Sequence, residues 1–598
     1  MSQIIKLKNS QTPSAVPTAG DLILGEVAVN TYEGWLHYKK NDGSDEILTL
    51  DPAAIEAAQA SADNALSVAQ SKVAPDELGD YATYSVDSFS DLIAGLPVTL
   101  QVGDTVTTGL TVWEIVSTVT PVAIVGGLYA KPLNKLYISD FGADRTGVVE
   151  ATAAWQQAYD LGDQFAPKVS VKMASGTYRV GELTMKAGVG TYGVGKNDVR
   201  LVPAGDTIQI FKLDLGTGGG ANLDMVGFSI QSDTNTGVKG VLGIGCNRLN
   251  LFDIGFFGCE ENFRLDLGGW NRVINCETSG GATTPSGYFW VGSSDDSEYG
   301  CVFSVIENYQ IRVTGTGSAD PACVFRRAVA LKITNLIASS QEFTGTMALV
   351  ENDCQGLMFT DCSSVGFGIG LWMRKGSGID KSPIFNNFNN FEFDQNSTNA
   401  VLLEAGINNR FISCPVTSSF VGTDTQAIVI KPDGIQNRFF GCHVTGYFDA
   451  GGVGWLFEGA DGNVLDHCVV SGCETGVTAN GLGHSNNKLI SCDFSNDISG
   501  FAVTGDWTNA GNKFINLQGT LPASVTAPAV PTSGVAQSNP YPVDARLFIQ
   551  PNTLISFEIN GGTVVPWTTP LDIVLRAGET ITLFYTGIAP TWTWVASQ

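Results

Sequence analysis

The sequence predicts an all-β protein whose body is a parallel β-helix, a rod of short strands stacked coil upon coil. A short phrase recurs at a nearly constant interval between Asn386 and Leu517, and each copy alternates apolar and polar residues. A fixed period of this size indicates one supersecondary unit stacked many times, and the alternation is a strand pattern. No long helical periodicity lies between the copies. We therefore expect one coil per copy, each ~4.8 Å above the last.

Each copy of the phrase begins with Asn and closes on Cys or another apolar residue. Successive Asn positions lie 23, 28, 26, 24 and 25 residues apart. The copies are Asn386–Phe391, Asn409–Cys414, Asn437–Cys442, Asn463–Cys468, Asn487–Cys492 and Asn512–Leu517.

Cysteine recurs at one position of this repeat. The residues that share it are Cys276, Cys362, Cys414, Cys442, Cys468 and Cys492. Alternation directs them into the rod, where a reduced thiol packs as a small apolar side chain. A metal site is the alternative, but the chain has no paired Cys-x-x-Cys spacing. We predict an interior packing column, with no metal and no cofactor.

Composition narrows the classes of partner. The chain has 598 residues and 70 Gly, and its 59 acidic against 33 basic residues give a net charge of −26. This charge argues against nucleic acid and against an anionic membrane surface, and it suits neutral or hydrated ligands. No apolar segment follows Met1 and no apolar run is long enough to span a bilayer, so we expect synthesis in a cytoplasm and no membrane insertion.

Residues 1–50 predict a small β module. Short strand patterns in Pro17–Asn30 and Gly34–Tyr38 are separated by turn signals, with another turn at Asn41–Ser44. The segment resembles the N-terminal part of bacteriophage tail fibres and tailspikes. That resemblance implies an anchor to phage tail proteins and a place in the virion. The alternative is an ordinary small β-domain.

Residues 51–76 predict a helix, with Asp51 as its cap and Pro52 in its first turn. The apolar stripe is narrow and consists of Ile55, Ala58, Ala62, Leu66, Ala69 and Val73. Such a stripe suits a thin trimeric coiled coil; a helix lying on its own chain is the alternative. Residues 77–135 alternate strand and turn patterns and are interpreted as an adaptor.

The body is assigned to residues 136–520. Asp140-Phe-Gly-Ala143, then Gly147 and Thr152–Ala158, resemble the opening of pectate-lyase-like β-helix proteins, a family that includes many phage tailspike depolymerases. The resemblance implies a right-handed parallel β-helix, a capping helix over residues 152–161, a homotrimer and a bacterial surface polysaccharide as ligand. Glu150-Ala151 stands where this family commonly has a pair of Asp residues. That motif is architectural, so the departure leaves the predicted fold unchanged.

Residues 521–598 open with a Pro-rich connector, Pro522–Pro531, and then predict a small β-sandwich. The segment resembles C-terminal modules of phage depolymerases, which assist trimerisation or bind sugar. Trp567, Trp592 and Trp594 are candidates for stacking on sugar rings, although such residues more often lie in the core.

Charged residues on a second recurring strand give the first candidate site. Alternation points one of them outward in each coil, with alternating sign: Glu351, Arg374, Glu404, Lys431 and Glu458. They form either a surface ion-pair ladder, in which each pair contributes little, or a carboxylate-lined groove. We take Glu404 and Glu458 as catalytic candidates and the other three as substrate-binding candidates.

The second candidate site is the pair Glu392 and Asp394, expected outward on one strand and ~6.8 Å apart. That separation overlaps the range of inverting glycosidases, and tilted side chains would reach the retaining range. His443 is expected in the same outward column, ~9.6 Å away, and His467 is a further residue to test. Asp295, Asp296 and Glu298, on a long loop, complete the substrate-binding candidates; each of these residues has a plain solvated role as its alternative.

Three functions remain open from the sequence. The first is a homotrimeric tailspike that hydrolyses capsule or O-antigen. A variant of this function is a lyase, in which Lys431, His443 or Tyr447 acts as the base. The second is a glycan-binding protein that does not cut. The third is a secreted pectate-lyase-like enzyme, which the missing signal segment disfavours.

Overall fold

The computed structural model describes four strands between residues 7 and 50, and residues 83–94 and 100–596 apart from short gaps. The gaps are 118–119, 121, 125–127, 134, 233, 281–287, 295–299, 314–320, 342, 377–380, 419–424, 448–450, 481–482, 497–500, 506, 508–510, 516, 518–526, 541–543, 551–553, 567–570 and 577. The coiled coil expected over 51–76 lies outside the described residues. The chain forms two compact units, residues 1–84 with 100–105, and 85–99 with 106–598.

The first unit contains a four-stranded sheet in the order β1-β2-β3-β4. Its strands are β1 (Leu7–Ser10), β2 (Val27–Asn30), β3 (Trp35–Lys39) and β4 (Ile47–Leu50). β1 is parallel to β2, and the other neighbours are antiparallel.

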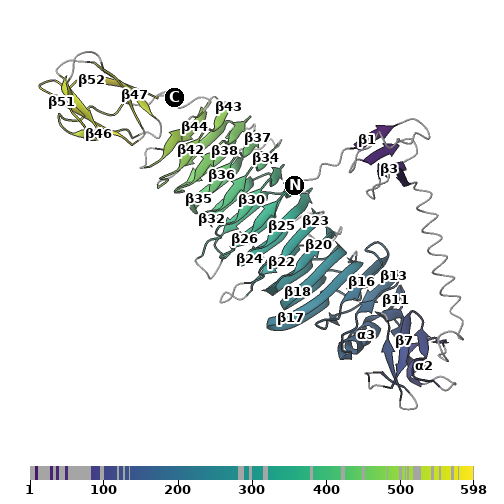
Figure 1. Ribbon diagram of the computed structural model, residues 1–598. Helices are drawn as coiled ribbons and strands as arrows, with labels where there is room; N and C mark the ends of the chain where they lie inside the picture. Colours follow the sequence, from purple (N-terminus) through teal and green to yellow (C-terminus); the bar gives the residue numbers. More distant parts are fainter. Residues whose placement is uncertain are drawn as a thin grey trace. The chain divides into compact units, whose positions relative to one another are not determined.

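The second unit is dominated by one continuous parallel β-solenoid of 36 strands, wound into about 14 coils (Figure 1). The prediction of an all-β chain with a parallel β-solenoid body is therefore confirmed. The early strands are β10 (Leu136–Tyr137), β11 (Thr146–Glu150), β12 (Val171–Lys172), β13 (Gly176–Val180), β14 (Leu183–Thr184), β15 (Thr191–Tyr192), β16 (Val199–Pro203), β17 (Gln209–Gln231), β18 (Lys239–Phe257) and β19 (Glu261–Gly269).

From residue 270 on, each coil has three sides, and each side pairs with the same side of the next coil. The first side consists of β20 (Arg272–Ile274), β23 (Val305–Val313), β25 (Lys332–Ser340), β27 (Met358–Thr360), β30 (Asn387–Asn389), β33 (Arg410–Ile412), β36 (Arg438–Phe440), β39 (Val464–Asp466), β42 (Lys488–Ile490) and β45 (Lys513–Ile515). β23 and β25 continue into the second side.

The second side consists of β21 (Glu277–Ser279), β28 (Ser363–Val365), β31 (Glu392–Asp394), β34 (Pro415–Thr417), β37 (His443–Thr445), β40 (Val469–Ser471) and β43 (Asp493–Asn496). The third side consists of β22 (Tyr288–Gly292), β24 (Cys323–Arg326), β26 (Thr346–Glu351), β29 (Ile369–Arg374), β32 (Asn399–Ile407), β35 (Gln426–Ile435), β38 (Val453–Glu458), β41 (Thr475–Asn480) and β44 (Phe501–Gly505).

The recurring Asn of the sequence phrase is buried and links successive coils. The six residues are Asn386, Asn409, Asn437, Asn463, Asn487 and Asn512. In each step the backbone N–H and the side-chain Nδ2 of one Asn donate to the Oδ1 of the next, at 2.9–3.3 Å. We call this set the Asn ladder. It satisfies backbone donors at a bend of each coil, where the regular strand pairing ends.

The phrase is two strands rather than one. A residue in left-handed conformation separates the first side from the second, for example Asn390, Ser413 and His467, with φ of 50°, 51° and 51°. This conformation costs a non-glycine residue ~1–2 kcal/mol. Stacked side chains offset part of that cost: the Asn308 amide donates to Asn275 at 3.0 Å, on the neighbouring coil.

The interior is apolar along the whole solenoid. Phe388, Phe411 and Phe439 stack with ring centroids 4.7 and 4.6 Å apart. All 12 cysteines are buried and free, and consecutive thiols of Cys414, Cys442 and Cys468 interact with one another. The predicted interior thiol column is confirmed.

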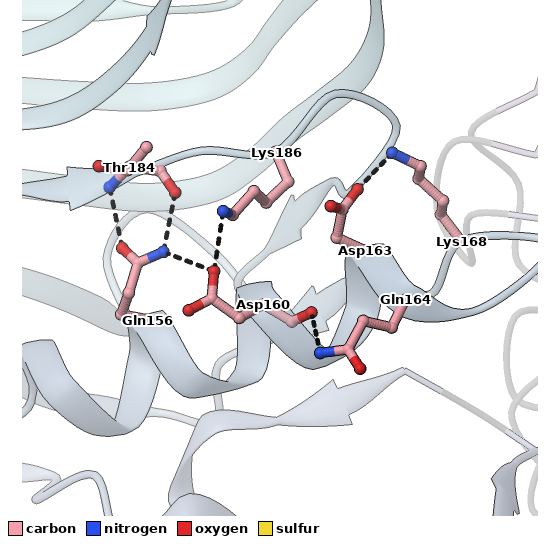
Figure 2. Close-up of polar contacts among 7 residues, drawn as sticks. All are labelled: Gln156, Asp160, Asp163, Gln164, Lys168, Thr184 and Lys186. Atoms are coloured by element: carbon pink, nitrogen blue, oxygen red, sulfur yellow. Dashed lines mark hydrogen bonds and ion pairs between the residues drawn. The ribbon is translucent and has the colours of Figure 1, made fainter. Parts of the chain in front are cut away.

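Helix α3 (Thr152–Gln164) closes the N-terminal end of the solenoid. Its apolar face carries Trp155, which packs edge-on against Tyr178 and Phe211 of the first coils. Its polar face is tied to the end of the sheet (Figure 2): the Gln156 amide accepts from the N–H of Thr184 at 2.9 Å and donates to its carbonyl at 3.1 Å. The side chain thus replaces a neighbouring strand at an edge that would otherwise be open to pairing.

A second set of contacts in Figure 2 holds the same helix by charge. Asp160 pairs with Lys186 at 2.9 Å, and Asp163 pairs with Lys168. The helix is three residues longer than the 152–161 expected from the sequence.

A small five-stranded sheet precedes the solenoid, in the order β5-β6-β7-β9-β8. Its elements are β5 (Thr83–Val86), α2 (Phe89–Ala94), β6 (Thr105–Thr108), β7 (Thr111–Val116), β8 (Val122–Ala123) and β9 (Tyr129–Pro132). The 3-10 helix η1 (Ile138–Phe141) presents the buried Asp140 to it. The Asp140 carboxylate accepts from the N–H of Thr111 at 2.6 Å and of Leu110 at 3.1 Å.

The C-terminal residues form two antiparallel sheets, β46-β51-β48-β49 and β50-β47-β52, that share one apolar cluster. The strands are β46 (Ala536–Ser538), β47 (Ala545–Gln550), β48 (Leu554–Ile559), β49 (Val565–Pro566), β50 (Leu571–Leu575), β51 (Thr580–Tyr585) and β52 (Thr591–Ala596). Trp592 and Trp594 are buried in that cluster, so neither presents a ring face to a sugar. Trp567 lies outside the described residues.

Candidate functional site

The charged row on the third side contains two ion pairs. The Arg374 guanidinium donates to Glu351 at 3.1 Å, and the Lys431 ammonium donates to Glu404 at 2.8 Å. Arg326 also belongs to this row, because the strand register places it one coil before Glu351. It was not among the residues predicted from the sequence. The pattern Cys323-Val-Phe-Arg326 could have identified it, because it matches the later copies of the third-side strand.

Glu351 is less exposed than the alternation suggested, since only 10% of its side chain is accessible. Arg374 covers it while lying 4.4 Å from the ring centre of Trp372. By contrast, Glu404 and Lys431 keep 32% and 37% of their side chains exposed. Glu458 lies one coil beyond Lys431 and is partly exposed. Glu404 and Glu458 are therefore two coils, ~9.6 Å, apart with a lysine between them.

An apolar column accompanies the charged row on the outward face of the third side. It consists of Trp290, Val324, Leu349, Trp372, Leu402, Val429 and Leu456. These residues form clusters separate from the interior core, and Arg264 lies 4.4 Å from the ring centre of Trp290. Cation–π contacts with half-covered arginines explain how tryptophans are accommodated on an outer face.

Glu392 and Asp394 stand on β31, at the second side, on either side of the interior residue Phe393. Glu392 is exposed and accepts from Ser363 at 3.3 Å, whereas Asp394 is partly buried and accepts from Thr417 at 2.5 Å. Neither carboxylate has an ion pair within the described part of the chain. This distinguishes them from Glu351 and Glu404.

His443 is exposed on β37 and lies 3.3 Å from the hydroxyl of Ser471. Its column is the one that Glu392 occupies two coils earlier, as β31 pairs with β34 and β34 with β37. His467 is exposed and contacts Asp466 at 2.6 Å and the ring of Phe440.

Tyr447 differs from its role as a candidate base. Its side chain is 1% exposed, and its hydroxyl has no hydrogen-bond partner among the described residues. Burial, with smaller contributions from Cys473 and Asp394, raises the pKa of Tyr447 far above its ordinary value. A phenol that keeps its proton and cannot reach solvent does not act as a base on a polymer.

The remaining sequence candidates Asp295, Asp296 and Glu298 lie outside the described residues. Within the residues that the structure describes, no group of three His, Cys, Asp or Glu side chains could hold a metal ion. No helix in the described ranges has both the length and the apolar character needed to cross a membrane.

Comparison with known proteins gives structural likeness only. No family model matches the sequence, and no curated protein matches it. Tailspike protein 3 of bacteriophage CBA120 is 12% identical, with a TM-score of 0.45 over 86% of this chain and 79% of the other.

Two further solved structures share the solenoid at a similar level. A variant tailspike of the E. coli bacteriophage HK620, in complex with a hexasaccharide, is 10% identical, with a TM-score of 0.45 over 77% of this chain and 92% of the other. The A-module of the Azotobacter vinelandii mannuronan C-5 epimerase AlgE6 is 12% identical, with a TM-score of 0.42 over 65% and 100%. The neighbours thus include phage tailspikes, in agreement with the resemblance seen in the sequence, and at these scores they carry no argument about residues or reaction.

Proposed function

We propose that this chain is a phage tail protein that binds and depolymerises a bacterial surface polysaccharide, capsule or O-antigen. The observation that carries the proposal is the placement of Glu392 and Asp394. A stacked solenoid holds both carboxylates at fixed positions on its outer wall, and no cation neutralises them in the described structure. The resemblance at Asp140–Ala143 and in residues 1–50 supports the setting, a tailspike that projects from a virion.

The reaction we propose is glycoside hydrolysis. One carboxyl group protonates the glycosidic oxygen as the bond to the anomeric carbon breaks, and the other carboxylate takes a proton from the water that attacks that carbon. Residues at alternate positions of a strand are ~6.8 Å apart, at the lower end of the ~6.5–9.5 Å separation of inverting enzymes.

The second pair, Glu404 and Glu458, ranks below the first in this proposal. Glu404 is engaged by Lys431 at 2.8 Å, and that lysine separates the two carboxylates along the rod. We assign Glu404 and Glu458 to sugar hydroxyl binding, together with Glu351, Arg374, Lys431, His443, Asp295, Asp296 and Glu298.

The test is the length of a purified capsular polysaccharide after incubation, measured by size-exclusion chromatography. Glu392→Gln and Asp394→Asn are each expected to slow cleavage by about 10²–10⁴-fold, as for loss of an acid or base. Glu404→Gln is the comparison, because it removes a carboxylate that we assign to sugar binding: it is expected to raise KM while the maximal rate of cleavage stays close to that of the wild type. The opposite ranking of the variants would move the active site to the third side.

Two other outcomes identify different functions. An unsaturated product that absorbs ultraviolet light would show a lyase, for which exposed His443 is the candidate base. An unchanged polymer length with retained binding would show a receptor-binding protein that does not cut.

We also propose a homotrimer, with a coiled coil over residues 51–76, that attaches to phage tail proteins through residues 1–50. Light scattering of the full chain is expected to give three times the 63.2 kDa chain mass. A monomeric mass would contradict the assembly and leave the carboxylate site to be judged by the cleavage assay.

A further inference from the structure

One corner of the solenoid carries a column of residues in left-handed conformation. In each coil this residue precedes the Asn-ladder position and joins the third side to the first. The corner residues are Trp270, Phe303, Ala330, Gly356, Phe385, Asn408, Gln436, Gly462, Asn486 and Gly511, with φ between 49° and 84°. We call this set the corner column. Bridges from Gly269 to Val302 and onward along the rod keep it in register.

Three corner residues are aromatic, although the backbone there favours Gly or Asn. Glycine has no Cβ to clash, and Asn tolerates the left-handed region better than bulky residues do. Five of the later corners follow this preference: Gly356, Asn408, Gly462, Asn486 and Gly511. Trp270, Phe303 and Phe385 do not. Because the same corner is made elsewhere without an aromatic ring, the rings are not needed for the fold. A conformational outlier that the fold does not require points to a function.

The three rings face solvent. Trp270, Phe303 and Phe385 are 53%, 56% and 58% exposed. Trp270 and Phe303, on adjacent coils, stack with ring centroids 5.9 Å apart and an interplanar angle of 25°. The two stacked rings therefore form an exposed apolar patch two coils long.

Small residues separate this patch from the third ring. Ala330 and Gly356 occupy the next two corners, and a Cβ added at Gly356 would meet nothing nearer than 3.9 Å. Phe385 follows, so Phe303 and Phe385 are three coils, ~14.4 Å, apart. The result is an open interval bounded by aromatic rings, one residue wide and aligned with the rod.

Two cationic side chains lie beside the corner column, although the chain carries a net charge of −26. Arg272 and Lys332 lie two residues after their corners, in one outward column of the first side. Both are exposed, and neither has an ion pair within the described residues. The Arg272 guanidinium lies 5.9 Å from the ring centre of Phe252, a contact that occupies none of its N–H donors. Both side chains can therefore meet an anion.

We propose that the corner column from Trp270 to Phe385 is a binding strip for an acidic polysaccharide. Aromatic rings cover the apolar C–H faces of sugar rings, and Arg272 and Lys332 meet the carboxylate or phosphate groups of the polymer. The strip ends in the coil that carries Glu392, since Phe385 and Glu392 flank the same strand β30. The proposal rests on the proposed function and adds the substrate class.

A protein partner suits the strip less well. Stable protein interfaces bury about 800 Å² on each side and deplete lysine at their core. The strip is a single row of rings with gaps and an adjacent lysine, and it does not offer such a patch. An extended polymer one sugar wide matches the strip.

The test combines Trp270→Asn, Phe303→Asn and Phe385→Asn in the full chain. Asn suits the left-handed corner, so the thermal midpoint is expected to stay or rise. The probes are purified bacterial capsular and O-antigen polysaccharides on an array, some with uronate or phosphate groups and some neutral. We expect the wild type to bind at least one acidic polymer and the triple variant to bind it at least about tenfold more weakly. Gln436→Asn makes the same kind of change at a non-aromatic corner and should leave binding unchanged.

A second variant tests the charge. Arg272→Gln with Lys332→Gln is expected to weaken binding to the acidic polymer and to reduce its dependence on salt. Equal binding by wild type and this variant, or binding of neutral polymers alone, would overturn the acidic class.

The remaining outcomes separate the strip from the proposed function. If the wild type binds a polysaccharide and the triple variant binds it equally, the strip is wrong and the proposed function stands. If the wild type binds none, both fail. If the triple variant instead changes the mass of the assembly in light scattering, the column is a contact between chains and the proposal is overturned.

Discussion

Asn409 donates its backbone N–H and its side-chain amide to the same oxygen, Oδ1 of Asn437, at 3.0 and 2.9 Å. Asn437 repeats the arrangement with Asn463 at 2.9 and 3.1 Å. Each Asn thus accepts two bonds from the preceding coil and passes two to the following one. Removing one member leaves buried donors and acceptors in both neighbours, so the ladder is sensitive to a single change.

Asn437→Ala is expected to destabilise the solenoid by about 3 kcal/mol or more, because buried polar groups that lose their partner each cost ~1–3 kcal/mol. The lost partners include the carbonyl of Gly406, which accepts from Asn437 Nδ2 at 2.9 Å. The measurement is the guanidinium midpoint of the full chain by tryptophan fluorescence. Asn389→Ala, an exposed outward Asn on β30, is the control and should shift stability by no more than ~0.5 kcal/mol. Equal midpoints for the two variants would show that the ladder contributes nothing.

Tyr447→Phe is expected to keep full activity and to be neutral or slightly stabilising. Its buried hydroxyl has no partner in the described structure, and an unsatisfied buried polar group is a cost that Phe removes. Polysaccharide cleavage and the thermal midpoint are the two measurements. Loss of cleavage at an unchanged midpoint would restore the tyrosine as a catalytic group.

Alkaline pH is expected to destabilise the protein through its thiols. Burial raises the pKa of Cys259 and of Cys354 from 9.0 to about 12. Between pH 9 and 12 the folded thiol keeps a proton that the unfolded thiol has released, so stability falls as pH rises. Each such thiol contributes a slope of ~1.4 kcal/mol per pH unit inside this window.

The check is the guanidinium midpoint between pH 8 and 11, under reducing conditions. Cys354→Ala should make stability fall less steeply with pH, by the contribution of one thiol. A midpoint independent of pH would contradict the raised thiol pKa values. At pH 8 the folded protein should leave a thiol reagent unreacted, and the unfolded chain should consume 12 equivalents.

Asp140→Asn is expected to loosen the β6–β7 hairpin from η1. The carboxylate accepts backbone bonds from Thr111 and Leu110, and hydrogen bonds to a charged group contribute ~1.5–3 kcal/mol. Limited proteolysis should cut within residues 105–116 faster in this variant. Asp91→Asn, which changes an exposed carboxylate in α2, is the control. Identical digestion patterns would show that Asp140 does not hold the hairpin.

The repeated part of the fold could be predicted because buried groups leave a periodic mark. Asn437 must accept bonds from the coil before it, and Cys442 must fit an interior column, so both recur at the coil period. The coils before residue 247 could not be predicted in the same way, because β17 and β18 are long strands of 23 and 19 residues that bend without the phrase. The left-handed break at Ser413 also escaped detection, although Phe411 and Cys414 both face the interior at a spacing of three residues that strict alternation does not allow.

The candidate site was harder to predict, because alternation shows which side chains point outward and does not show which other side chains surround them. Glu392 and Asp394 face outward as expected, yet Glu351, on an equally outward position, is paired with Arg374 and only 10% of its side chain is accessible. Tyr447 occupies an inward position after a turn whose geometry the sequence did not reveal. The aromatic corner column was not noticed, because its members are spaced by whole coils and only the backbone conformation makes them unusual.

The repetition of the Asn ladder also makes the rod adjustable in length. Deleting residues 437–462, a segment of 26 residues between equivalent asparagines, brings Asn463 to the place where Asn437 accepts from Asn409. The join would find the same donors, acceptors and interior thiol, because Cys468 replaces Cys442. A gene for such a chain can gain or lose one coil at a time, and the distance between its two ends then changes by a single strand spacing with every duplication.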